Sequence, residues 1–74
     1  FRCMDLAREA CRKGGSYPVV MNSVNEVLVQ RFIDGKIKFL DIQEGIEQAM
    51  HRHDPLYNLS IDEIMEIDRE ARLI

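Results

Sequence analysis

Residues 14–27 of the 74-residue chain read GGSYPVVMNSVNEV, and this stretch contains the boundary between two predicted helices. The two glycines follow two basic residues, and glycine readily adopts the left-handed conformation that ends a helix. Proline fits the first turn of a helix, because its missing N–H needs no partner there. We therefore predict that one helix ends at Lys13 and that the next begins near Pro18 and runs to about Asp34, where Gly35 stops it.

The second of these helices is the most apolar segment and carries apolar residues on two sides. One stripe, flanked by Val20 and Val27, consists of Met21, Val24, Leu28 and Phe32. The other stripe mixes polar with apolar residues and consists of Asn22, Asn25, Glu26, Val29 and Ile33. The residues left for the solvent face are Ser23, Gln30 and Asp34. Such a helix is either the centre of a bundle or packs on a second domain as well as its own.

Helical periodicity also predicts a first helix, from about Cys3 to Lys13, and a third, from Phe39–Asp41 to Arg52. The apolar side of the first consists of Cys3, Met4, Leu6, Ala7, Ala10 and Cys11. The third has core spacing at Phe39, Ile42, Ile46, Ala49 and Met50. Gly45 inside the third helix costs about 1 kcal/mol relative to alanine, and close approach of a neighbouring helix would explain it.

A capping box at Ser60, with Glu63 three residues later, marks the start of a fourth helix. Its expected inner face consists of Ile61, Ile64, Met65 and Ala71. No stretch shows the alternation of a convincing β-strand, and the connections between helices are short. The sequence therefore predicts an all-α protein, a small four-helix antiparallel bundle that forms one domain over residues 1–74.

Composition and charge exclude several classes of protein. The net charge is −3, with acidic and basic residues interspersed, so the basic stripe that binds nucleic acid is missing. No apolar run approaches the roughly 20 residues of a membrane helix. Cys3 and Cys11 lie about 12 Å apart along one helix, too far for a disulfide, so we expect two reduced core thiols and a cytoplasmic protein. Because the first residue is Phe1 rather than methionine, we expect a segment of a longer chain.

Few side chains are placed to carry out chemistry. His51, His53 and Asp54 could suggest a metal site, but residues two apart on a helix point about 200° apart, so we rank this reading last. The alternative is that His53 lies at the end of the apolar stripe while His51 is solvated. Asp68 falls on the apolar side of the fourth helix and needs a partner, which Arg72 can provide one turn later. A structural carboxylate is favoured over a catalytic acid.

The polar groups of Asn22, Asn25 and Glu26 also require hydrogen-bond partners. In an isolated bundle those partners would be loops or water, whereas in a larger enzyme they could belong to an adjacent domain. The sequence leaves the two alternatives open. It shows no glycine-rich phosphate loop and no nucleophile with a neighbouring base, so we expect no catalytic, cofactor-binding or metal-binding residue in this segment.

Residues 14–27 resemble the Gly-Gly, Pro, then Asn-x-x-Asn-Glu signature near the C-terminus of the 1-deoxy-D-xylulose 5-phosphate reductoisomerase family. Three further segments agree in order, namely 1–7, 35–42 and 60–72, the last with the Asp-x-x-Ala-Arg ending at Asp68–Arg72. Arg2 replaces the proline that is usual in the family, which should affect only how the chain enters the first helix. The resemblance spans nearly the whole chain.

The resemblance implies a parent enzyme that rearranges 1-deoxy-D-xylulose 5-phosphate and reduces it with NADPH to 2-C-methyl-D-erythritol 4-phosphate. A divalent cation, Mg or Mn, assists, and the step belongs to the non-mevalonate route of isoprenoid synthesis. In that family the C-terminal domain is a helical bundle, the parent is generally a homodimer, and the nucleotide, metal and phosphate sites all precede this region. None of those residues can be carried over to a position here.

We therefore expect residues 1–74 to be an accessory C-terminal domain that is inactive alone and docks on the catalytic domain of its parent chain. The best docking candidates are Asn22, Asn25 and Glu26, and Asp68 with Arg72 is expected to be structural. The alternative from another class is a free-standing helical protein-interaction module.

Overall fold

The computed structural model describes residues 2–74 and contains four α-helices. Their bounds are α1 Arg2–Lys13, α2 Tyr17–Ile33, α3 Phe39–Arg52 and α4 Ile61–Ala71. The described residues form no β-strand, and none of their helices is long and apolar enough to cross a membrane. The predicted all-α fold is confirmed, and the predicted helix bounds are correct to within about one residue.

The ends of the helices follow from local sequence chemistry. Gly14 and Gly15 have φ values of 71° and 55°, and the Gly14 N–H donates to the Ala10 carbonyl at 3.0 Å, which ends α1. The predicted capping box is present at the start of α4. The Ser60 hydroxyl accepts from the Glu63 N–H at 3.1 Å, and the Ser60 N–H donates to the Glu63 carboxylate at 3.0 Å.

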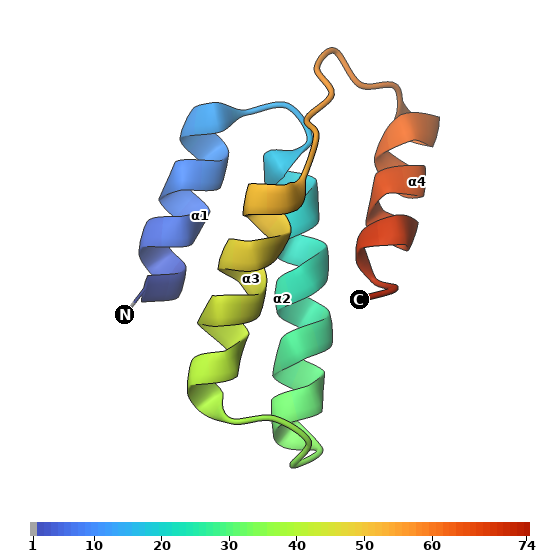
Figure 1. The fold of residues 1–74 in the computed structure, drawn as a ribbon. Helices are drawn as coiled ribbons and strands as arrows, with labels where there is room; N and C mark the ends of the chain where they lie inside the picture. Colours follow the sequence, from blue (N-terminus) through green and yellow to red (C-terminus); the bar gives the residue numbers. More distant parts are fainter. Residues whose placement is uncertain (1) are drawn as a thin grey trace.

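The central position belongs to α2, which packs against each of the other three helices. The helices alternate in direction along the chain, and α1 and α4 lie at opposite edges of the domain in Figure 1. α1 also packs on α3, whereas α4 packs mainly on α2. The interpretation of α2 as the centre of a bundle is therefore confirmed.

The hydrophobic core comes from α1, α2 and α3. Among residues 2–74, the buried apolar side chains of this core are Leu6, Ala10, Val20, Val24, Leu28, Ile42, Ile46 and Met50. The predicted core position of Phe39 is wrong, because its side chain is 48% exposed. It packs edge to face on Phe32, the last residue of the apolar stripe of α2, which is 40% exposed at the α2–α3 turn. Both cysteines are free, as predicted, but Cys11 is exposed rather than in the core.

The predicted inner face of α4 is also largely wrong. Ile61, Ile64 and Met65 are 76%, 38% and 65% exposed, and α4 contributes no buried residue to the core. Ala71 packs against the core as predicted, but the helix is rotated so that Ile67, rather than the other three, packs there with it. The apolar side of α4 that the sequence indicated is therefore left uncovered within the described residues.

Gly45 of α3 lies directly against the Leu28 side chain of α2. A Cβ atom at this position would lie 2.5 Å from Cδ1 of Leu28, well inside contact distance. The glycine thus permits the close helix approach that its place inside a helix suggested.

Candidate functional site

Ser16 fixes the loop before α2 to the loop after α3. Its side chain is fully buried, and its backbone N–H donates to the Leu56 carbonyl at 2.9 Å. The Leu56 N–H in turn donates to Ser16 Oγ at 2.8 Å, and this oxygen lies 2.6 Å from Nε2 of His53. The hydroxyl can accept from Leu56 and donate to a neutral imidazole at the same time. This arrangement orients the start of α2 and the chain that leads to α4.

His53 is half-buried against this junction, whereas His51 is exposed, as the structural interpretation of the two residues predicted. The His53 ring lies edge-on to the Tyr17 ring, with centroids 5.4 Å apart. Burial lowers the pKa of His53, and the nearby Asp54 carboxylate opposes this shift only in part. Residues 2–74 hold no group of three or more His, Cys, Asp or Glu side chains suited to a metal ion.

The lowered pKa of His53 predicts a pH-dependent stability. Below an unfolded-state pKa of about 6.5 the unfolded chain binds more protons than the folded one, so stability is full at pH 7.5 and falls as the pH drops toward 5.5. We expect His53→Gln to flatten this dependence, measured by urea unfolding across that range. His51→Gln, at an exposed histidine, is the matched control and should keep the slope. An unchanged slope in His53→Gln would contradict this account.

Asp68 and Arg72 pair across one turn of α4 and join that helix to α2. Arg72 Nε lies 3.1 Å from both carboxylate oxygens of Asp68, which also accepts a hydrogen bond from the Ser23 hydroxyl. The prediction that Ser23 faces solvent is wrong, because Ser23 is fully buried between the two helices. The Arg72 guanidinium, followed by the Ser23 hydroxyl, lowers the pKa of the Asp68 carboxyl.

The three predicted docking residues lie in different surroundings. The Glu26 carboxylate lies 2.6 Å from Arg72 Nη2, so it belongs to the α2–α4 connection. Asn22 is exposed and Asn25 is half-buried, and neither side chain has a hydrogen-bond partner among residues 2–74. The structure therefore separates Glu26, which is engaged inside the domain, from the two asparagines.

Asn22 lies in a shallow groove between α2 and α4 with a volume of about 440 Å³. The groove is lined by Pro18, Val19, Asn22, Ile64, Met65 and Asp68. Its walls are thus mainly apolar, with one unpartnered amide and one carboxylate that Ser23 and Arg72 already satisfy. We call it the α2–α4 groove.

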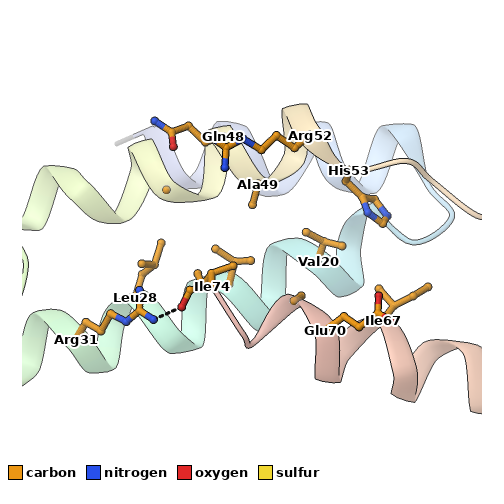
Figure 2. Close-up of a pocket in the computed structure, with 13 residues that line it drawn as sticks. Val20, Leu28, Arg31, Gln48, Ala49, Arg52, His53, Ile67, Glu70 and Ile74 are labelled. Atoms are coloured by element: carbon orange, nitrogen blue, oxygen red, sulfur yellow. Dashed lines mark hydrogen bonds between the residues drawn. The ribbon is translucent and has the colours of Figure 1, made fainter.

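A second groove, of about 450 Å³, lies over α2 between α3 and α4 (Figure 2). Val20 and Leu28 form part of its floor, and His53 at the end of α3 lies opposite Ile67 of α4. The polar residues that line it are Arg31, Gln48, Arg52, His53 and Glu70. At one end, Arg31 donates to the backbone carbonyl of Ile74 (Figure 2). We call it the α3–α4 groove.

The comparisons with known proteins agree on one family. The family described as the DXP reductoisomerase C-terminal domain matches residues 1–74. Relatives named 1-deoxy-D-xylulose 5-phosphate reductoisomerase include those of Chloroherpeton thalassium, Macrococcus caseolyticus and Geobacillus kaustophilus, which are 53%, 50% and 49% identical over 72 residues. These matches cover 97% of this chain but only 19% of each relative, so the chain spans about a fifth of their length. No solved structure matches the chain.

Proposed function

The chain belongs to the DXP reductoisomerase C-terminal domain family, and from this we propose that it is the accessory C-terminal domain of a 1-deoxy-D-xylulose 5-phosphate reductoisomerase. The observation that carries the proposal is the match over all 74 residues, together with about 50% identity to enzymes of that name. The parent enzyme would convert 1-deoxy-D-xylulose 5-phosphate to 2-C-methyl-D-erythritol 4-phosphate. We propose the cytoplasm as its location and a homodimer as its assembly.

NADPH and a divalent ion, Mg or Mn, would bind to the part of the parent chain outside this domain. The described residues offer neither a ligand cluster that fits such an ion nor a glycine-rich loop for a nucleotide phosphate. The polar side chains that converge here serve the fold, since Ser16 joins two loops and Asp68 joins two helices. We therefore assign no reaction step to this domain and expect it to be inactive alone.

The role that remains for the domain is to dock on the catalytic domain and hold it in place. Asn22 and Asn25 support this role, because they have unused hydrogen-bonding groups within the described part of the chain. Glu26 is held by Arg72 through Oε2, so its other carboxylate oxygen, Oε1, can accept a hydrogen bond from the catalytic domain.

An assay of NADPH oxidation with 1-deoxy-D-xylulose 5-phosphate and Mg or Mn tests the proposed function. The chain encoded by the complete reading frame is compared with the 74-residue chain. Turnover by the complete chain alone is the expected result. Absence of turnover by both would overturn the proposal and favour a free-standing helical interaction module.

The combined substitution of Asn22→Ala, Asn25→Ala and Glu26→Ala in the complete chain is expected to reduce turnover. Loss of an interface hydrogen bond whose partner stays buried costs about 1–3 kcal/mol, so docking should weaken by about tenfold or more. The same assay measures this effect, with Gln30→Ala on the exposed side of α2 as the control. Full activity of the triple variant would exclude these residues as docking contacts.

A further inference from the structure

α4 presents an apolar side that nothing among residues 2–74 covers. Ile61, Ile64 and Met65 lie at positions i, i+3 and i+4, so they share one side of the helix, and they are 76%, 38% and 65% exposed. Single exposed apolar residues are ordinary on soluble proteins, whereas contiguous apolar patches mark interaction surfaces. This side of α4 therefore needs a separate explanation.

The apolar surface continues from α4 onto α2. Ile64 and Met65 line the α2–α4 groove together with Pro18 and Val19 at the start of α2. Two helices thus contribute to one concave, mainly apolar surface, and the Ser23–Asp68 hydrogen bond beneath it fixes their relative position. A preformed concavity of this kind suits a rigid protein partner better than a flat exposed helix does.

The two polar side chains of the groove, Asp68 and Asn22, differ in how many free hydrogen-bonding groups they have. The Asp68 carboxylate is satisfied by Ser23 and Arg72, so it contributes to the wall rather than to a new contact. The Asn22 amide has a free donor and a free acceptor within the described residues. An apolar groove with one such amide fits a partner surface that is apolar and presents a backbone or side-chain polar group to Asn22.

Two other surfaces with apolar residues are less suited to this role. In the α3–α4 groove, Arg31 already binds the Ile74 carbonyl at one end, and the lining includes charged residues from all three helices. At the α2–α3 turn, Phe32 and Phe39 pack on each other and are 40% and 48% exposed, but this surface lies apart from Asn22 and from the exposed side of α4.

We propose that the α2–α4 groove receives the rest of the parent chain, with Met65 and Ile64 as apolar anchors and Asn22 as the polar contact. The occupant follows from length, because the matched relatives are about five times longer than this chain and their remaining four-fifths lies outside it. Interfaces between domains of one chain bury about 600–1,500 Å² and combine apolar with polar contacts. The α2–α4 groove offers both kinds of contact. The inference rests on the proposed function, and it specifies the surface through which the domain supports the enzyme.

Met65→Asp in the complete chain tests the inference, with Leu40→Asp as the matched control. The two side chains are 65% and 63% exposed and both lie on helices, but Leu40 is at the start of α3, outside the groove. We expect Met65→Asp to raise amide hydrogen exchange over residues 19–22 and 61–68 by about tenfold or more, because a charge must be desolvated for docking. Leu40→Asp should leave exchange in these segments unchanged. Met65→Gln, which keeps the length without a charge, should have a smaller effect in the same direction.

Equal exchange in Met65→Asp and Leu40→Asp would overturn the inference. It would also be overturned if Met65→Asp converted a dimeric complete chain into a monomer in sedimentation velocity, because the groove would then receive a second copy. The turnover assay on the unsubstituted complete chain separates the two proposals. If that chain turns over substrate while Met65→Asp shows no change in exchange, only the docking surface is wrong.

Discussion

Gly15→Ala is expected to destabilise the domain by about 3 kcal/mol or more, a large part of the roughly 4–11 kcal/mol available to a chain of this size. Gly15 has a φ of 55°, where an alanine costs about 1–2 kcal/mol. A Cβ atom would also lie 2.5 Å from the Leu56 carbonyl oxygen and 2.6 Å from the Tyr57 ring. Because one of the atoms is backbone, the loop must move, and its hydrogen bonds to Ser16 would be strained.

Gly14→Ala provides the control for this prediction. Gly14 has a φ of 71°, but no heavy atom lies within 4 Å of a Cβ at that position. The substitution should therefore cost only the conformational term of about 1–2 kcal/mol. Urea unfolding of the 74-residue chain measures both variants. If both lowered the free energy of unfolding equally, the contact with Leu56 would not contribute to the cost of Gly15→Ala.

Ile46→Ala is expected to cost about 3–4 kcal/mol. Ile46 is 0% exposed in the middle of α3, so the substitution removes apolar contacts and leaves a cavity that the surrounding helices can fill only in part. Ile46→Val removes one methylene group and should cost about 1 kcal/mol.

Ile33→Ala is the matched control, because Ile33 is 68% exposed near the end of α2. Its effect should stay within about 0.5 kcal/mol, as is usual for surface positions. Thermal and urea unfolding followed by circular dichroism measure the series. If Ile33→Ala lowered the free energy of unfolding as much as Ile46→Ala, the assignment of Ile46 to the core and of Ile33 to the surface would be wrong.

The helix ends could be predicted from the sequence because their causes are local. Gly14, Pro18 and the Ser60 capping box each act within one turn, so neighbouring residues are enough to identify them. The capping box was found in the structure with both of its hydrogen bonds.

The side that each helix buries was harder to predict, because it depends on partners far along the chain. Periodicity found the apolar stripe of α4 but could not show that Ile61 and Met65 face outward. The rotation of α4 follows from the hydrogen bond between Ser23 and Asp68, which are 45 residues apart. The polarity of Ser23 predicts exposure to solvent, because the sequence does not show that the Asp68 carboxylate of α4 lies against it.

The Ser16 junction was missed for the same reason. Ser16 and His53 are 37 residues apart, and no pattern within either segment connects them. The only signal was the double glycine, which predicts a left-handed turn but not the loop that lies against Gly15. The docking candidates came from polarity on one stripe, and that stripe could not reveal that Glu26 is paired with Arg72.

The absence of buried α4 residues also has a consequence for how the chain folds during synthesis. The eight buried apolar residues of the described chain lie between Leu6 and Met50, so all of them are available as soon as α3 has left the ribosome. Neighbouring helices in sequence also pack on one another, and such local topology favours rapid folding. The first three helices can therefore begin to pack while α4 is still being translated, and α4 then adds Ile67 and Ala71 to the core.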